Sequence, residues 1–301
     1  MALGYDGTLY ILAFDHRGSF RKMLGITGTP TEDEAASLRD AKRLIFEGAQ
    51  RAVADGAPAD KVGVLVDEEM GADVARDAKA AGLKLAMPCE ASGQKVFDFE
   101  YGEEFGAHIE AFDPDFSKVL VRWNPDDDAT DKGVQGERLA RLGEWLHAND
   151  RKFLFELLVP ASDRQMTLVG GDAAAYDTEV RPYVTLEAID EIQAAGIEAD
   201  IWKIEGLDRA ASCELLSGLA RRDGRDGVVA VVLGRGADDA AVDHWLREGA
   251  GVEGYAGFAI GRSIFRAAIE GIRDGTMERD AAIADVAANY RRFIDVYEGA
   301  V

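Results

Sequence analysis

The feature that most constrains the fold is an alternation of short apolar runs with longer amphipathic segments. The apolar runs, each expected to be a strand, are Thr8–Phe14, Val62–Val66, Leu83–Met87, Lys118–Trp123, Phe153–Leu158, Asp200–Ile204, Val228–Leu233 and Tyr255–Ile260. The expected helices include Glu32–Ala54, Gly136–Ala148, Leu186–Ala195, Arg209–Arg221, Asp238–Glu248 and, near the end, Arg279–Tyr297. Alternating strands and helices predict a parallel sheet, because a crossover helix usually joins parallel strands. Eight such units in 301 residues predict an α/β protein of the (β/α)8 TIM barrel type.

An open, doubly wound sheet is the alternative architecture. It would usually carry a glycine fingerprint after its first strand, and Asp15-His16-Arg17-Gly18 lacks that pattern. No internal repeat or domain boundary divides the chain, so residues 1–301 are expected to form a single domain.

Two local features of the connections can be checked against the structure. The long connection Val159–Thr185 follows the fifth strand, and a connection of this length is usually a lid or contains short structure of its own. Thr31 and Thr185 are expected to cap the helices that follow them.

The composition limits the partners and the compartment. The formal net charge of −22 argues against nucleic acid and against an anionic membrane as partners. No apolar run is long enough to span a bilayer, and the first residues lack the basic region of a signal peptide. The two cysteines, Cys89 and Cys213, are expected to be buried thiols in a reducing cytoplasm. The sequence leaves open whether the chain forms a homo-oligomer.

Lys203 is the leading candidate for a catalytic residue. It lies in the apolar run Asp200–Ile204, and a buried lysine is costly unless its charge is compensated. Burial lowers the pKa of an amine and frees it to attack a carbonyl carbon, so Lys203 is a candidate Schiff-base nucleophile. The alternative is a structural lysine at a strand end, with its stem on apolar surface and its ammonium in water.

Glu156 and Lys118 favour the catalytic interpretation. Glu156 lies within a near-continuous apolar run, so its carboxylate must be paired or protonated. In a barrel ordered as the sequence, the strands of Lys118 and Lys203 flank the strand of Glu156. One carboxylate between two amines suits imine formation followed by proton transfer. The alternative is an ion pair that only stabilises the barrel interior.

The ends of the last two predicted strands favour a phosphate site. Gly234-Arg235-Gly236 and Gly261-Arg262 combine glycines, which permit close backbone approach, with basic side chains. In barrels of this kind, the loops after strands seven and eight present N–H groups and a helix N-terminus to an anion. Arg262 would bind phosphate through two parallel hydrogen bonds. The alternative is an arginine paired with a carboxylate at the barrel rim.

Neither a metal centre nor an organic cofactor is expected. Of the four histidines, only His16 falls at a predicted strand end, whereas a zinc enzyme would need several converging histidines. The turn Asp67-Glu68-Glu69 could hold a hard cation such as Mg²⁺; the alternative is a solvated acidic turn or one that contacts substrate hydroxyls.

Five segments carry a family resemblance: Leu9–Phe20, Asp177–Pro182, Asp200–Arg209, Val232–Gly236 and Gly257–Arg262. They resemble the class I aldolases of the tagatose-1,6-bisphosphate aldolase type. More closely, the chain resembles the 2-deoxy-5-keto-gluconate 6-phosphate aldolase domain that many bacteria fuse to the inositol-catabolic kinase.

The resemblance implies a (β/α)8 fold and a role for four residues. The Schiff-base lysine of the family falls on Lys203, its acid/base glutamate on Glu156, its strand-four lysine on Lys118 and its phosphate-binding arginine on Arg262. The Asp-Gln-Arg-Gly of the tagatose enzymes appears as Asp15-His16-Arg17-Gly18, so no role is carried onto the histidine.

The implied reaction is cleavage of 2-deoxy-5-keto-gluconate 6-phosphate to dihydroxyacetone phosphate and malonate semialdehyde. Asp15, Arg17, Arg122 and Arg235 are further candidates for substrate binding, and Arg17 or Arg122 is expected to pair with the substrate carboxylate. Tagatose 1,6-bisphosphate or a sulfo-sugar phosphate is an alternative substrate. A barrel that binds sugar phosphates without catalysis is the alternative of another class.

Overall fold

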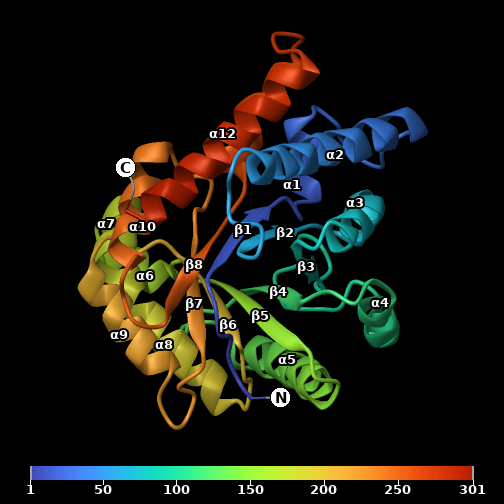
Figure 1. Cartoon of the computed structure of the whole chain (residues 1–301). Coiled ribbons are helices and arrows are strands. Elements are labelled where there is room, and N and C mark those ends of the chain that lie inside the picture. Colours follow the sequence, from blue (N-terminus) through green and yellow to red (C-terminus); the bar gives the residue numbers. More distant parts are fainter. Residues whose placement is uncertain (1, 300–301) are drawn as a thin grey trace.

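The computed structural model describes residues 2–299, and its strands close into a parallel barrel in the order of the sequence (Figure 1). The strands are β1 Leu9–Ala13, β2 Val62–Leu65, β3 Lys84–Pro88, β4 Phe116–Arg122, β5 Lys152–Leu158, β6 Ile201–Glu205, β7 Val229–Leu233 and β8 Tyr255–Ile260. Each expected strand is present, with its ends shifted by at most two residues. The predicted (β/α)8 barrel is therefore confirmed, and the doubly wound alternative is excluded.

The barrel interior is an apolar layer with a charged layer above it. The apolar layer consists of Leu9, Ile11, Ala13, Leu65, Ala86, Phe116, Leu154, Ile201, Val231, Ala256 and Ala259. On β4, β5 and β6, a charged residue lies two positions beyond a residue of the apolar layer: Lys118 beyond Phe116, Glu156 beyond Leu154 and Lys203 beyond Ile201. Side chains two apart on a strand share a face. The fold therefore directs all three charged side chains into the barrel, towards its C-terminal end.

Helices surround the barrel and pack on it through two large buried apolar clusters (Figure 1). The α-helices are α1 Gly18–Met23, α2 Glu32–Ala54, α3 Glu68–Ala80, α4 Phe105–Phe112, α5 Ala129–Ala148, α6 Asp163–Leu168, α7 Ala173–Ala175, α8 Arg181–Ala194, α9 Ala210–Ala220, α10 Asp239–Gly249, α11 Arg262–Arg273 and α12 Arg279–Tyr297. The long helices α2 and α12 lie side by side. Both cysteines are buried and free, as expected.

One of the two predicted helix caps is present and the other is wrong. The Thr31 hydroxyl accepts a hydrogen bond from the Glu34 N–H, and the Glu34 carboxylate accepts one from the Thr31 N–H, which is the expected capping box. Thr185 instead lies inside α8, where its hydroxyl donates to the Arg181 carbonyl 2.8 Å away. The helix begins earlier because Pro182 suits the first turn, where its missing N–H has no helical partner to lose.

The connection after β5 has structure of its own. Between β5 and α8 the chain forms α6, α7 and a turn of π-helix, η2 Tyr176–Val180. The Tyr176 hydroxyl donates to the Val159 carbonyl at 2.9 Å and ties this segment to the end of β5. The connection is therefore a folded cover beside the strand ends rather than an open loop.

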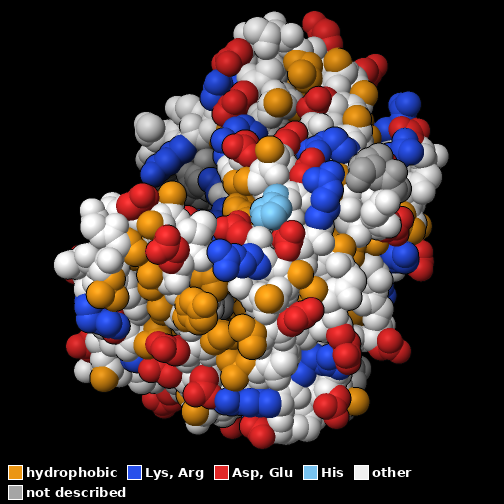
Figure 2. Space-filling model, turned by 90° about the vertical axis from the view of Figure 1, so that its left-hand side faces the viewer, with side chains coloured by type: hydrophobic (Ala, Val, Ile, Leu, Met, Phe, Trp, Pro, Cys, Tyr) orange, Lys and Arg blue, Asp and Glu red, His pale blue; other side chains and the backbone are white. Residues whose placement is uncertain are grey.

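The surface matches the acidic, mixed-charge composition. Figure 2 shows acidic and basic side chains interspersed over one face, with apolar side chains between them. Among residues 2–299, no helix combines the length and the apolar character needed to cross a membrane.

Candidate active site

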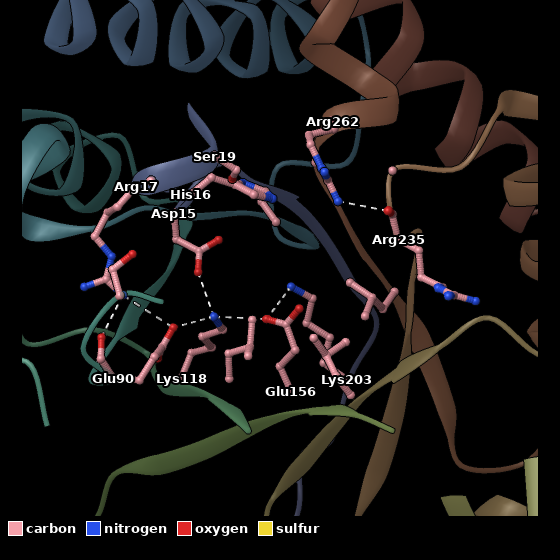
Figure 3. Close-up of a pocket in the computed structure, with 18 of the residues that line it drawn as sticks. Asp15, His16, Arg17, Ser19, Glu90, Lys118, Glu156, Lys203, Arg235 and Arg262 are labelled. Atoms are coloured by element: carbon pink, nitrogen blue, oxygen red, sulfur yellow. Dashed lines mark hydrogen bonds and ion pairs between the residues drawn. The ribbon is translucent and has the colours of Figure 1, made fainter. Parts of the chain in front are cut away.

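A cavity of about 670 Å³ lies at the C-terminal ends of the strands (Figure 3). The fold brings to it every residue that the sequence proposes for the site: Asp15, Arg17, Lys118, Arg122, Glu156, Lys203, Gly234, Arg235, Gly236, Gly261 and Arg262. These residues come from strand ends far apart in the sequence, and barrel closure alone places them around one volume.

Lys118, Glu156 and Lys203 form a continuous chain of contacts. Glu156 Oε2 lies 3.0 Å from Lys118 Nζ and 2.9 Å from Lys203 Nζ, so the two amines share one carboxylate oxygen (Figure 3). The strand register pairs Glu156 directly with Lys203, which explains the second contact. All three side chains are buried at the cavity wall, so the expected lysine–glutamate–lysine cluster is present.

The two lysines differ in how many carboxylates surround them. Lys118 Nζ lies 2.8 Å from Asp15 Oδ2, 2.8 Å from Glu90 Oε1 and 3.0 Å from Glu156 Oε2. Burial alone would lower the pKa of Lys118, but these carboxylates raise it well above its usual value. Within the described residues, Lys203 pairs with Glu156 alone. Lys118 is thus the fixed cation of the site, and Lys203 has a single carboxylate partner in the described structure.

Glu156 and Asp15 are carboxylates at neutral pH. Burial would raise the pKa of Glu156, yet the ammonium groups of Lys118 and Lys203 hold it below its usual value. The same balance applies to Asp15, where burial is outweighed chiefly by Lys118. Both side chains can therefore accept a proton or a hydrogen bond from a bound molecule.

Glu90 belongs to the cluster although the sequence did not single it out. It follows β3, is 5% exposed, and is fixed by a β-bridge to Phe99. Its Oε1 accepts a hydrogen bond from Lys118, while its Oε2 is buried and has no partner among the described residues. Burial raises the pKa of Glu90, against the lowering effect of Lys118. Its position directly after a strand, shared with Asp15, is the signal that could have identified it.

His16 is a neutral side chain at the cavity wall. Burial lowers the pKa of His16 to about 4; neighbouring Asp15 acts against this, while Arg262 and Lys203 add to it. The ring meets Phe265 edge to face at 6.1 Å between centroids, and Nδ1 is buried without a partner among residues 2–299.

Arg17 and Arg122, the two arginines proposed for a substrate carboxylate, differ in how they are bound. Arg17 is 7% exposed and donates to Glu100 Oε2 at 2.8 Å and to the Glu90 carbonyl at 2.7 Å. Arg122 is half-buried and donates to the Gln94 carbonyl at 3.0 Å. Arg17 is therefore committed to holding the Glu90 segment, whereas Arg122 is the better placed of the two to meet a substrate anion.

Arg235 after β7 and Arg262 after β8 also differ in how far their side chains are already paired. Arg235 contacts two carboxylates, Asp177 Oδ2 at 2.7 Å and Glu205 Oε1 at 2.9 Å. Arg262 donates to the Arg235 carbonyl at 2.9 Å and has no carboxylate partner in the described part of the chain. Gly236 has a φ of +71°, which favours glycine, and a Cβ there would lie 2.9 Å from the Arg262 guanidinium.

The acidic turn proposed for a cation is occupied by structural contacts. Asp67 pairs with the buried Lys42 and accepts from the Met70 N–H at the start of α3. Glu68 contacts His108, and Glu69 contacts Arg21. Across residues 2–299, no three His, Cys, Asp or Glu side chains gather in an arrangement that could hold a metal ion.

The fold and the site define a class: a (β/α)8 barrel with a buried lysine–glutamate–lysine cluster facing a cavity at the C-terminal ends of its strands. The chain belongs to the family described as "uncharacterized protein conserved in bacteria (DUF2090)", which it matches over residues 5–301. No curated protein matches the sequence.

Solved structures of similar fold include Schiff-base aldolases. An archaeal fructose 1,6-bisphosphate aldolase aligns with a TM-score of 0.60 at 16% identity, over 97% of this chain and 94% of that one. Another archaeal structure, captured with its catalytic lysine covalently bound to the carbinolamine intermediate, gives 0.58 at 16% identity, over 97% and 94%. The protein Cgl0159 of Corynebacterium glutamicum gives 0.60 at 19% identity, over 100% and 89%. At these identities the likeness establishes the barrel fold.

Proposed function

We propose that this protein is a class I aldolase that cleaves a phosphorylated keto sugar or keto sugar acid through an imine on Lys203. The observation that carries the proposal is Glu156 Oε2, which lies within 3.0 Å of the Nζ atoms of both Lys118 and Lys203. An amine, a proton-accepting carboxylate and a fixed cation at one point of a cavity are what imine-based cleavage needs. The resemblance of the site motifs and the Schiff-base aldolases among the structural neighbours support it.

The chemistry would proceed in two stages. Lys203 Nζ adds to the substrate ketone, water leaves, and the resulting iminium draws electrons from the adjacent carbon. Glu156 takes the proton from the hydroxyl on the next carbon, which becomes the aldehyde. The bond between that carbon and the carbon adjacent to the iminium then breaks. The enamine left on Lys203 is then protonated and hydrolysed, which restores the amine.

Arg262 is proposed to hold the substrate phosphate. It opens α11 after β8, and the N–H groups of the first helical turn provide further donors for an anion. Gly234, Gly236 and Gly261 would let the phosphate approach the backbone of the same corner.

The finer proposal is a substrate with a second anionic group, such as 2-deoxy-5-keto-gluconate 6-phosphate. In the closed strand order, β4 and β8 lie on opposite sides of the barrel. Arg122 at the end of β4 is thus placed to pair with a carboxylate while Arg262 holds the phosphate. Dihydroxyacetone phosphate and malonate semialdehyde would be the products. Tagatose 1,6-bisphosphate and sulfo-sugar phosphates satisfy the same two-anion requirement.

Release of dihydroxyacetone phosphate from a panel of these substrates tests the proposal. We expect cleavage that resists EDTA and is lost in Lys203→Met, with the acidic substrate losing most in Arg122→Ala. Cleavage abolished by EDTA, or retained in Lys203→Met, would contradict the imine mechanism. Binding of the whole panel without turnover would instead indicate a sugar-phosphate-binding barrel.

A further inference from the structure

The charged cluster holds more carboxylates than lysines. Asp15, Glu90 and Glu156 each contact Lys118, whereas Lys203 contacts Glu156 (Figure 3). Lys118 donates hydrogen bonds to Asp15 and Glu90 and forms an ion pair with Glu156. Arg17 also lies 3.6 Å from Glu90 but is itself paired with Glu100. With this pair included, the carboxylates still outnumber the cations by one, and a surplus of negative charge in a buried place favours uptake of a proton.

Glu90 is the member of the cluster that can take up this proton at least cost. Its Oε2 is buried without a partner among the described residues, so a proton there would break no hydrogen bond. The charged groups that face it are Lys118 at 2.8 Å, Arg17 at 3.6 Å and the carboxylate of Asp15. The thiol of neighbouring Cys89 is neutral, since burial raises its pKa to about 12. Asp15 and Glu156, in contrast, have lowered pKa values.

The proposed imine chemistry makes a conflicting demand on Glu156. Lys203 must lose a proton before it can attack a carbonyl, and the nearest acceptor is Glu156 Oε2 at 2.9 Å. A protonated Glu156 could not then accept the substrate hydroxyl proton during cleavage. The proton from Lys203 must therefore move further.

We propose that Glu90 receives the proton released by Lys203, through Glu156 and Lys118. Lys203 Nζ gives a proton to Glu156 Oε2, and Lys118 Nζ gives one of its own to Glu90 Oε1. The amine left on Lys118 turns about its Cε–Nζ bond so that its lone pair faces Glu156 Oε2, and it takes the proton from Glu156. One proton moves from Lys203 to Glu90, Lys118 stays an ammonium, Glu156 stays a carboxylate, and the charge of the cluster is unchanged. A half-turn of the Glu90 carboxyl then puts the protonated oxygen in the unpartnered position. Glu90 acts through Lys118 and need not touch the substrate; the inference rests on the proposed aldolase function.

The test is the rate at which borohydride traps dihydroxyacetone phosphate on the protein, measured across pH. Glu90→Gln keeps an acceptor for Lys118 but cannot take a proton. We expect its trapping rate to be roughly a hundredfold below wild type near pH 7. The deficit should shrink towards about pH 9.5, because hydroxide then removes the proton from Lys203 directly. Glu198→Gln, which alters a half-buried carboxylate paired with Arg225, should match wild type throughout.

Two outcomes would overturn the role of Glu90. A Glu90→Gln rate equal to wild type near pH 7 would do so, and so would a deficit of the same size at every pH, which would mean that Glu90 only positions Lys118. If Glu90→Gln does not fold, Glu90→Asp and Glu90→Asn replace it, and Asp must trap faster than Asn near pH 7. Wild-type protein that gives no adduct at all would remove the proposed function itself, so the two failures are distinguishable.

Discussion

Residues that look equivalent in the sequence differ in the partners that they contact in the folded structure. Arg235 and Arg262 both follow a barrel strand, yet Arg235 is paired with Asp177 and Glu205 while Arg262 binds only a backbone carbonyl in the described structure. A guanidinium already paired with two carboxylates has little left to offer an anion, whereas Arg262 retains free donors. The phosphate-binding role is therefore proposed for Arg262, and Arg235 is expected to form part of the cavity wall.

Removal of the Arg262 side chain should weaken binding of phosphorylated ligands selectively. Arg262→Ala is expected to raise KM for a phosphorylated substrate roughly tenfold to a hundredfold, because a hydrogen bond to a charged group contributes about 1.5–3 kcal/mol. Imine trapping of unphosphorylated dihydroxyacetone should change little. Arg247→Ala, on the exposed face of α10, is the matched control. Equal losses for both ligands would argue against phosphate binding by Arg262.

The site residues were predictable from the sequence where a charge interrupts an apolar run, as at Glu156 and Lys203. Glu90 was overlooked because it lies beyond the last apolar residue of its strand, where only its place after a strand end distinguishes it from an ordinary loop glutamate. Only the path of the backbone after β3 shows that its carboxylate turns back towards Lys118. The pairing that commits Arg17 to Glu100, 83 positions along the chain, is equally invisible in one sequence.

Among the elements, α2 supports the segment between β1 and α1 that carries Asp15 and His16. Lys42 of α2 is fully buried and donates to the carbonyls of Phe14 and His16, and it pairs with Asp67 at the start of α3. This ammonium satisfies backbone groups that have no strand partner, so it fixes the segment from the side opposite the cavity.

Loss of the Lys42 ammonium should lower the stability of the fold, because it leaves the buried Asp67 carboxylate without a partner of opposite charge. Lys42→Met is expected to lower the free energy of unfolding by about 3–5 kcal/mol, since Asp67 is then buried without compensation. The double variant Lys42→Met/Asp67→Leu should recover part of this loss, although it forgoes the cap on α3. Urea denaturation of the two variants measures the difference. A double variant no more stable than Lys42→Met would contradict this account.

Element boundaries were predictable where capping chemistry is local. The Thr31 and Glu34 pair marks the start of α2 because each side chain caps the other residue's N–H. The start of α8 was misplaced because Thr185 resembles a cap, whereas the preceding π-helical turn carries the chain into the helix earlier. A single π-helical turn is not marked by the apolar spacing of about 3.6 residues that identifies an α-helix in a sequence.

Across the whole molecule, Asp200 closes the end of the barrel opposite the cavity. Its buried carboxylate accepts hydrogen bonds from the N–H groups of Gly4 and Phe153 and from Lys152, and contacts His147 Nε2 at 3.0 Å. It therefore joins the N-terminal segment, α5, β5 and the start of β6. Burial alone would raise the pKa of Asp200, but these hydrogen bonds hold it below its usual value.

The lowered pKa of Asp200 predicts acid sensitivity. A carboxyl whose pKa is lower in the folded state stabilises the fold above its unfolded pKa of about 4, and this contribution is lost as pH falls through the folded value. Asp200→Asn should therefore be less stable than wild type at neutral pH by about 2–4 kcal/mol, and the two should converge in acid. Thermal unfolding from about pH 7 to about pH 3 follows this, with the exposed Asp6→Asn as control. Parallel curves would contradict the assignment.

The architecture as a whole was predictable, because eight apolar runs separated by amphipathic helices leave few alternatives. Barrel closure itself is a property of all eight strands and cannot be read from any one of them. The same strand order brings the charged cluster together. Lys118 and Lys203 are 85 positions apart in the sequence, and they both reach Glu156 only because β4, β5 and β6 pair in order.

Imine formation on Lys203 is tested by reducing the protein with borohydride in the presence of dihydroxyacetone phosphate and locating the adduct by peptide mass spectrometry. If Lys203 forms the imine, one adduct is found on Lys203, none on Lys118, and none in Lys203→Met. An adduct on Lys118, an adduct that persists in Lys203→Met, or no adduct on the wild-type protein would contradict it.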